Sequence, residues 1–281
     1  MRPLLSVVIA NYNYGRFLED AIQSVITQDA GDQVELIICD AASTDNSVEI
    51  IRKYSSKIAW WCSEKDKGQS DAFNKGFAHA HGRFLTWLNA DDILLPGTFS
   101  ALHYASIASP ECEWFTGNFL QFKHHDGEIT FAPWGPHFLP KFLQGPETQL
   151  MIFGPTTFWT REAYAKVGPI DINLHYSMDT DYWIRMKIAG YQQGRINHCC
   201  WAFRLHEESK TAQYEERDID MITKQKWFEE LRVIHKRHNY YPRKRNKWLT
   251  RLWRLIDGSL AVALYRRCFI VGRDFQKYLS Y

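Results

Sequence analysis

The chain has 281 residues, which suffices for one large domain with or without an appendage. Its hydrophobic content of 45% and charged content of 23% are those of a globular protein. The formal net charge of +2 argues against a protein that is dedicated as a whole to binding nucleic acid.

Two further properties bear on where the protein works. The six cysteines show no Cys-x-x-Cys pair and no zinc spacing, so we interpret them as reduced, mostly buried thiols of a cytosolic protein. The chain enters a strand directly, and no run of 18 apolar residues follows. We therefore expect neither a signal peptide nor a membrane span.

The first 95 residues alternate between apolar runs and helical patterns. We expect strands at 4–10, 34–40, 57–63 and 83–88, and helices at 16–28, 45–54 (with Asp45 as N-cap) and 70–81. Four such alternations predict an α/β fold with a doubly wound, mostly parallel sheet and helices on both faces. The spacing Gly-x-Gly-x-x-Gly is absent after the first strand, which disfavours a dehydrogenase.

The stretch from Phe84 to Asp92 is a buried strand that ends in two adjacent carboxylates, Asp91 and Asp92. Ligands of open α/β sheets bind beyond the carboxyl ends of the strands. Two hard oxygen donors at such an end suit Mg²⁺ or Mn²⁺, and a diphosphate is the natural partner of that ion. The alternative is that both residues only cap the helix that begins near Pro96.

Other polar residues flank the same edge of the predicted sheet. Asp40 ends the second strand, either as a loop cap or as an acceptor for a nucleobase or ribose. Asp71, Asn74 and Lys75 share one face of the third helix by their spacing. Such a face is usually just solvated, but beside a diphosphate it would contact the ligand.

The pattern changes after about residue 96. We expect a helix at 96–109, a hairpin of strands 113–119 and 128–131, a loop-rich stretch at 133–155, helices at 161–167 and 174–186, a strand at 201–206 and a helix at 219–238. His124 and His125 lie in the hairpin connection, where exposure is a better interpretation than metal binding. Trp134, Phe138 and Phe142 either stack on sugar faces or pack in the core.

A basic segment follows the last predicted helix. Between Arg232 and Arg254 there are nine Lys or Arg and no Asp or Glu, with Trp and Leu interleaved. This pattern suits an anionic membrane surface. The alternative is a tail helix packed on the core or on another subunit.

Several segments together resemble family 2 glycosyltransferases. They are Val7–Asn13, Asp40 with Ser43–Asp45, Asp66–Gly76 and Leu88–Asp92, and the resemblance extends over residues 4 to 210. It implies the GT-A fold and inverting transfer from a nucleotide-diphosphate sugar. We accordingly expect a glycosyltransferase domain at 1–211, with a nucleotide-sugar half at about 1–110 and an acceptor half at about 111–211, and a helical extension at 212–281. The chain departs from the family in having Asn89 where the metal motif often begins with Asp, which leaves open whether Asp91 or Asp92 touches the metal.

The resemblance also implies site residues. The nucleotide-sugar contacts would be Asn11, Asn13, Asp40, Asp66, Gly68, Asp71, Asn74, Lys75, Asp91 and Lys210, and the metal ligands would be Asp91, Asp92 and His206. Asp179 corresponds to the catalytic Asp of the family's Glu-Asp motif, whose Glu is replaced by Met178. At the start of a helix, Asp179 would be ionised and could serve as general base. Asp181 is the second candidate for that base.

The implied partners are a nucleotide-diphosphate sugar (a UDP-sugar foremost, otherwise a GDP- or dTDP-sugar), Mn²⁺ or Mg²⁺, and a saccharide or lipid-linked acceptor. The implied setting is bacterial surface polysaccharide or glycolipid assembly, in the cytoplasm or peripherally on the inner face of the membrane. The Gln-x-x-Arg-Trp signature of processive synthases is not seen, which favours single addition. Three alternatives are a nucleotidyltransferase, a non-catalytic nucleotide-sugar or membrane-surface binding protein, and a nucleic-acid binder that uses the basic tail.

Overall fold

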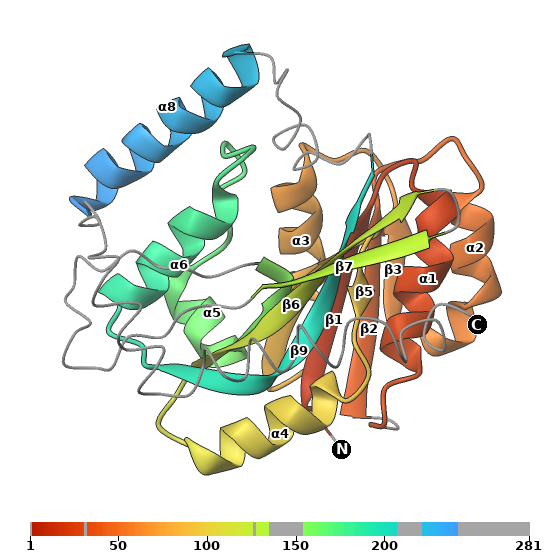
Figure 1. Ribbon diagram of the computed structural model, residues 1–281, viewed down its shortest axis with the longest axis horizontal. Coiled ribbons are helices and arrows are strands. Elements are labelled where there is room, and N and C mark those ends of the chain that lie inside the picture. Colours follow the sequence, from red (N-terminus) through yellow and green to blue (C-terminus); the bar gives the residue numbers. More distant parts are fainter. Residues whose placement is uncertain (1, 31–32, 126–127, 135–153, 207–220, 241–281) are drawn as a thin grey trace.

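The computed structural model is an α/β fold in which helices cover both faces of one sheet (Figure 1). The described residues are 2–30, 33–125, 128–134, 154–206 and 221–240. The described sheet has nine strands, eight in the order β3-β2-β1-β4-β8-β6-β9-β5, with β7 paired to β6.

The amino-terminal half is a parallel unit in which strands alternate with helices. Its elements are β1 (Leu5–Asn11), α1 (Gly15–Ile26), β2 (Val34–Asp40), α2 (Ser47–Lys53), β3 (Trp60–Ser63), α3 (Gln69–Ala78) and β4 (Phe84–Asn89). β1 pairs in parallel with β2 on one side and with β4 on the other. The strand order therefore reverses at β1, and the carboxyl end of β1 is the place where open α/β sheets bind ligands.

β1 is buried on both faces because successive side chains of a strand point to opposite sides. Val7 and Ile9 pack in the cluster that includes α1, whereas Val8 packs with Phe73 of α3 on the other face. A Cβ at Gly76 would lie 2.2 Å from Cγ1 of Val8, so this glycine lets α3 approach the sheet closely. The β-branched, uninterrupted apolar run of β1 follows from this two-sided burial.

The second half extends the same sheet with mixed pairing. Its elements are β5 (Ile93–Leu94), α4 (Thr98–Ala108), β6 (Trp114–His125), β7 (Glu128–Trp134), β8 (Thr157–Thr160), α5 (Arg161–Val167), α6 (Met178–Ile188) and β9 (Gln193–Leu205). β8 pairs antiparallel with β4, and β9 pairs parallel with β6 and antiparallel with β5. This pairing returns the end of β9 to the turn that follows β4.

A cluster of buried tryptophans joins the two halves. The ring of Trp87 in β4 stacks on Trp183 of α6 with centroids 5.4 Å apart, and Trp183 in turn stacks on Trp114 at 5.6 Å. Trp159 of β8 lies 5.0 Å from Trp87. The four rings are at most 2% exposed, so they fix α6 against the sheet that carries the predicted site.

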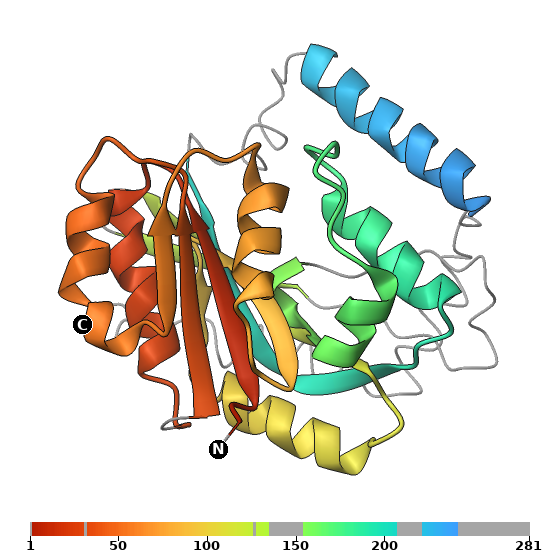
Figure 2. The same ribbon diagram turned by 180° about the vertical axis from the view of Figure 1, so that it is seen from behind.

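The last described helix, α8 (Met221–His238), lies outside α6, on the side away from the sheet (Figures 1 and 2). Ile234 of α8 is fully buried in a cluster with Leu174, Ile184 and Tyr240. α8 therefore packs on the core, and within the described residues no helix is long and apolar enough to cross a membrane.

The predicted fold class is confirmed, and most element predictions hold with small changes at the ends. β5 and β8 are not predicted as strands, because two and four residues are too few for a periodic pattern. β6 and β9 extend well beyond the predicted strands 113–119 and 201–206, and α6 begins at Met178 instead of 174. The N-cap position of α2 is Asn46, one residue after the predicted Asp45, but Asp45 Oδ1 accepts the backbone N–H of Ser47 at 3.0 Å and so caps the start of the helix with its side chain. Most of the predicted loop at 133–155, most of the basic segment and Lys210 lie outside the described residues.

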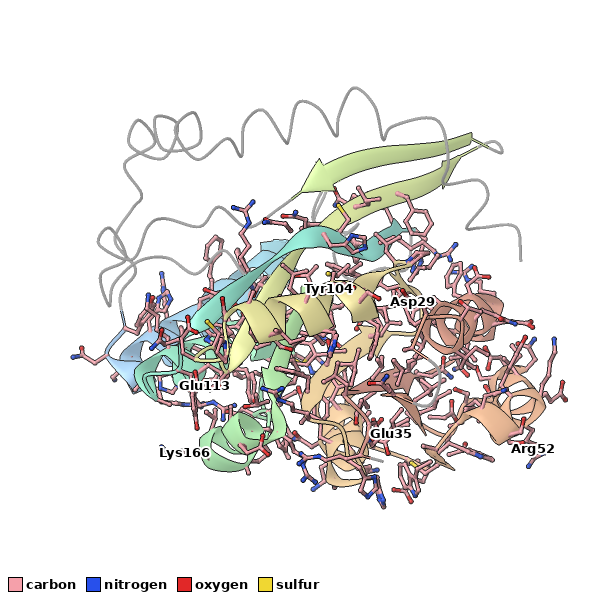
Figure 3. The ribbon with its side chains drawn as sticks, turned by 90° about the horizontal axis from the view of Figure 1, so that it is seen from below. Asp29, Glu35, Arg52, Tyr104, Glu113 and Lys166 are labelled. Atoms are coloured by element: carbon pink, nitrogen blue, oxygen red, sulfur yellow. The ribbon has the colours of Figure 1, made fainter. Side chains whose placement is uncertain are left out.

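The edge of the sheet away from the carboxyl ends of the parallel strands has its own carboxylate, Glu35, labelled in Figure 3. Glu35, near the start of β2, accepts hydrogen bonds from Ser6 Oγ at 2.5 Å and from the backbone N–H of His81 at 2.8 Å. Its second oxygen lies 2.8 Å from His81 Nδ1. This group joins β1, β2 and the loop before β4, and we assign it to the stability of the fold.

Candidate active site

Side chains at the carboxyl ends of β1, β2 and β3 meet at Asp40. Asp40 is 1% exposed and accepts hydrogen bonds from Asn11 Nδ2 at 2.7 Å and from Ser63 Oγ at 2.6 Å. Ser43 adds its backbone N–H at 3.0 Å and its hydroxyl at 2.5 Å. Four donors therefore hold this carboxylate, so Asp40 organises the loops around it. Its contact with a nucleobase stays a prediction.

The loops after β1 and β2 are tied to each other. Asn13 has a φ of 56°, a left-handed conformation that Asn tolerates better than most residues. Its Oδ1 accepts the backbone N–H of Thr44 at 2.8 Å, and its own N–H donates to Ser43 Oγ at 2.8 Å. Asp45 accepts the N–H of Gly15 at 2.8 Å. Burial opposes ionisation of Asp45, but the hydrogen bonds from Ser47 and Gly15 prevail and lower its pKa.

The loop between β3 and α3 is shaped by two of the predicted carboxylates. Asp66 accepts the N–H of Gly68 at 2.8 Å, and Asp71 accepts the N–H of Lys67 at 3.0 Å. Gly68 has a φ of 111°, which a residue with a Cβ rarely adopts, so glycine is required at this turn. The carboxylates thus set the path of the loop that leads into the amino terminus of α3.

Asn74 and Lys75, which the helical spacing places on one face of α3 with Asp71, point to different parts of the structure. Lys75 Nζ lies 3.8 Å from Asp71 and 3.0 Å from Glu64, at the loop. Asn74 turns away: its Nδ2 donates to the carbonyl of Ile170 at 2.8 Å, and its Oδ1 accepts the N–H of Ile170 at 2.9 Å. The described contacts of Asn74 therefore dock the segment that precedes α6.

The two adjacent carboxylates after β4 have different surroundings. Asp92 is fully buried and accepts hydrogen bonds from Asn89 Nδ2 at 2.8 Å and from the N–H of Arg204 at 3.1 Å. Burial raises the pKa of Asp92 well above its usual range, and the neighbouring charge of Asp91 raises it further. Asp92 consequently joins the turn after β4 to β9.

Asp91 instead meets His206, at the end of β9. Its Oδ2 lies 3.0 Å from His206 Nε2, and the two side chains are 11% and 12% exposed. The His206 ring rests against Phe17 and Tyr14 of the loop and helix after β1, with centroids 4.8 and 5.6 Å apart. Two residues that are far apart in the sequence therefore present an oxygen and a nitrogen donor side by side.

This pair fits a divalent cation in chemistry and spacing. Two neighbouring ligands of an octahedral ion, each about 2.1 Å from it, lie about 3 Å apart. Among the described residues, His206 Nδ1 is buried without a hydrogen-bond partner. In the described part of the chain, no group of three or more His, Cys, Asp or Glu side chains could hold a metal. The pair would therefore share such an ion with ligand oxygens and water, as Mg²⁺ sites commonly do.

Arg204, which the sequence pattern did not predict as a site residue, connects the turn after β4 to α1. Its side chain, in a residue that is 4% exposed, donates to the backbone carbonyl of Asp91 at 2.9 Å and to Asp20 at 2.8 Å. Its guanidinium also lies over the ring of Phe17, 4.8 Å from the centroid. A charged residue within the apolar run of 201–205 was the available signal, because a buried arginine requires partners.

Asp179 lies in the first turn of α6. Its Oδ1 accepts the N–H of Thr180 at 2.6 Å and the Thr180 hydroxyl at 3.3 Å, and Oδ2 has no partner among the described residues. Burial raises the pKa of Asp179. The start of α6 lies beside the first turn of α3, since Ser70 Oγ donates to Met178 Sδ at 2.9 Å.

Asp181 has another role. It is 1% exposed, and its oxygens lie 2.8 Å from Arg185 Nε and 2.8 Å from His238 Nε2 of α8. A carboxylate held in this way by two partners is not available to an acceptor hydroxyl. The geometry thus favours Asp179 over Asp181 as a general base.

Fold and site together place an oxygen and a nitrogen donor, Asp91 and His206, side by side at the edge where open α/β sheets bind ligands. Residues 6–168 match Glycosyl transferase family 2, which is more than half of the chain. The chain therefore belongs to glycosyl transferase family 2, and the resemblance found in the sequence is confirmed.

Relatives of known sequence agree with this assignment. An uncharacterised glycosyltransferase of Nostoc sp. is 41% identical over 95 residues, covering 33% of this chain and 29% of that protein. The putative teichuronic acid biosynthesis glycosyltransferase TuaG of Bacillus subtilis is 27% identical over 221 residues, covering 74% of this chain and 81% of TuaG. The match with the first of these relatives thus spans less than a third of its length.

Solved structures share the fold at low sequence identity. S. aureus TarS (1–349) in complex with UDP-GlcNAc has a TM-score of 0.61 at 16% identity, covering 82% of this chain and 65% of that one. The mannosyltransferase PcManGT of Pyrobaculum calidifontis, in complex with GDP-Man and Mn²⁺, has a TM-score of 0.59 at 16% identity and covers 83% and 65%. The GT-A fold expected for this chain is thereby confirmed.

Proposed function

We propose that this protein transfers a sugar from a nucleotide-diphosphate sugar to an acceptor hydroxyl, with inversion at the anomeric carbon. The observation that carries the proposal is the meeting of Asp91 and His206 at 3.0 Å beside the switch point of the sheet. Membership of a glycosyltransferase family supports the proposal. The position of these oxygen and nitrogen donors supports it as well, since they lie at the sheet edge where open α/β folds bind nucleotides.

The donor would lie along the carboxyl ends of β1, β2 and β4. The network of Asn11, Asn13 and Asp40 would hold the nucleobase side, and the loop with Asp66, Gly68 and Asp71 would lie beside the diphosphate. Lys75 would add positive charge, Lys210 stays a predicted contact, and Asn74 would act by holding the segment that precedes α6. A UDP-sugar is our first choice, because a structural neighbour of this chain holds UDP-GlcNAc, and a GDP-sugar is the second.

Asp91 and His206 would bind Mn²⁺ or Mg²⁺, and Asp92 would hold the turn beneath them. The bound cation would neutralise charge on the departing diphosphate. Support for Mn²⁺ comes from the structural neighbour that contains it.

Asp179 would act as the general base. Its unpartnered Oδ2 would take the proton of the acceptor hydroxyl while the hydroxyl oxygen attacks the anomeric carbon. The bond from that carbon to the diphosphate breaks, and the nucleoside diphosphate leaves with the electron pair. Attack from the face opposite the leaving group inverts the carbon, and no covalent intermediate with the protein is needed.

The acceptor would be a saccharide or a lipid-linked precursor of a bacterial surface polymer, since TuaG is named for teichuronic acid biosynthesis. Such a role would place the protein at the cytoplasmic face of the membrane. The predicted contact of the basic segment with anionic lipid remains a separate proposal, because most of that segment lies outside the described residues.

A donor screen tests the proposal. Calorimetry with UDP-, GDP- and dTDP-sugars, with and without Mn²⁺, should reveal metal-dependent binding of one donor, and that donor should release its nucleotide slowly by hydrolysis. Asp179→Asn should lower turnover by about 100-fold or more and leave donor affinity within about threefold. Binding without turnover on any acceptor would favour the non-catalytic alternative, and salt-sensitive affinity for RNA or DNA without donor binding would favour the nucleic-acid binder.

A further inference from the structure

Helix α8 places a carboxylate against the segment that leads into α6. Glu230 Oε1 accepts the backbone N–H of His175 at 2.8 Å, and Oε2 accepts those of Tyr176 and Ser177, each at 2.9 Å. These donors are three consecutive backbone groups just before the first turn of α6. A carboxylate suits such a set, because its two oxygens accept several hydrogen bonds and complement the positive end of a helix.

Other contacts fix α8 where it can provide this carboxylate. Arg237 Nη1 lies 2.6 Å from Asp171, and His238 Nε2 lies 2.8 Å from the buried Asp181 of α6. Ile234 is fully buried against Leu174 and its neighbours. The last two turns of α8 therefore contact both ends of the segment 171–181, and Glu230 contacts the middle of that segment.

The braced segment determines where Asp179 lies. Ser177, whose N–H is bound by Glu230, directly precedes α6, and Asp179 follows two residues later. On its other side the segment meets the first turn of α3, where Ser70 Oγ lies 2.9 Å from Met178 Sδ, and the loop before α3, where a Cβ at Gly68 would lie 3.6 Å from His175. The segment is thus held between the loop beside the predicted donor and α8.

We propose that Glu230 is a positioning residue for the transfer reaction, which holds residues 175–177 so that Asp179 faces the acceptor hydroxyl. The extension beyond the family match at 6–168 is then part of the catalytic assembly. In this role Glu230 acts through the backbone of residues 175–177 and would not itself contact donor or acceptor. The inference rests on the proposed function, since it assumes that Asp179 is the base.

The test is Glu230→Gln in the full chain, with Glu229→Gln as the matched control. An amide has one acceptor oxygen and turns its NH₂ toward at least one of the three donors, so the brace loosens. Glu229 is the next residue on the same helix, is exposed and accepts a hydrogen bond only from Gln225, at 3.1 Å among the described residues. The control therefore makes the same chemical change without touching the segment.

Two readouts separate this inference from the proposed function. In hydrogen–deuterium exchange, Glu230→Gln should speed exchange of the 175–177 amides at least tenfold, with the 66–76 loop unchanged. With the donor found by the screen, kcat should fall about tenfold or more while the donor KM stays within threefold, because small misplacements of a catalytic group cost large factors. Glu230→Asp, which keeps both oxygens, should recover part of the kcat, and Glu229→Gln should match the wild type in both measurements.

Each contrary result identifies what is wrong. Unchanged exchange in Glu230→Gln would overturn the brace, whatever the protein catalyses. Faster exchange with wild-type kcat, in a protein whose Asp179→Asn variant is inactive, would overturn the positioning role and leave the proposed function intact. Wild-type turnover in Asp179→Asn would instead overturn the assignment of the base on which both proposals depend.

Discussion

The same substitution should affect different properties of the protein at the adjacent residues Asp91 and Asp92. Asp91 Oδ2 lies beside His206 Nε2 at 3.0 Å, whereas both oxygens of Asp92 accept hydrogen bonds from the protein. Asp91→Asn should therefore impair the cation site, and Asp92→Asn should impair folding stability. The two variants differ by one position in the chain, so each is the control for the other.

The expected magnitude for Asp92→Asn follows from its contacts. The amide keeps one acceptor and turns an NH₂ group toward either Asn89 Nδ2 or the N–H of Arg204, which leaves a buried donor unpaired at a cost of about 1–3 kcal/mol. Burial already disfavours the ionised form of Asp92 and raises its pKa, so a neutral side chain recovers part of that cost. We expect a net loss of about 1–2 kcal/mol, or about 2–8 °C in Tm for a domain of this size.

For Asp91→Asn the expected loss is in binding. Removing a group that merely orients a metal ligand typically costs about 10–100-fold in affinity, so removing the ligand itself should cost about 100-fold or more. Calorimetric titration of Mn²⁺ with the chosen donor present measures this loss, and thermal unfolding measures stability. If Asp92→Asn folds as stably as the wild type but loses Mn²⁺-dependent donor binding, while Asp91→Asn keeps it, our reading of this turn is wrong.

Three further outcomes are expected. Arg204→Lys should lower the unfolding free energy by about 1–3 kcal/mol in denaturant titration. One ammonium group cannot replace a guanidinium that bonds both the Asp91 carbonyl and the Asp20 carboxylate. Unchanged stability would show that the fold does not depend on these two hydrogen bonds. Glu35→Gln, at the opposite edge of the sheet, should lower stability by about 1–2 kcal/mol and leave kcat/KM of the folded enzyme unchanged, and a drop in kcat/KM would contradict its purely structural role. Burial raises the pKa of Asp179, and a general base must be ionised to accept a proton. As the pH falls, kcat for nucleotide release should therefore begin to decline above the pH expected for an ordinary Asp, whose pKa is about 3.9. A kcat profile that is flat down to pH 4 would argue against Asp179 as the base.

The sequence by itself determined the parallel half of the fold. The apolar runs of β1, β2 and β4 are long, β-branched or aromatic and bounded by turns, because these strands are buried on both faces and admit little else. The polar residues at or just after the ends of these strands, Asn11, Asp40 and Asp91, were predictable for the same reason. A carboxylate or amide that follows a buried apolar strand indicates the edge of the sheet. Family resemblance then supplied the roles that spacing alone left open.

Only the tertiary structure decided how neighbouring residues divide these roles. Asp91 and Asp92 are equivalent in a sequence pattern, yet one meets His206 and the other is sealed beneath it, because β9 returns beside the turn after β4. Asp179 and Asp181 differ likewise, since Arg185 and His238 of α8 hold Asp181, whereas Asp179 accepts a hydrogen bond from Thr180.

Local patterns could not predict the partners of Arg204 and Glu230, although the charge of Arg204 within an apolar run indicated that it needs partners. Each binds groups that are far away in the sequence, namely Asp20 and the backbone at 175–177. Periodicity reports what a residue's own element buries, whereas such bridges depend on which elements the folded chain brings together. The family match places the chain among glycosyltransferases, and these long-range contacts are what arrange its candidate site.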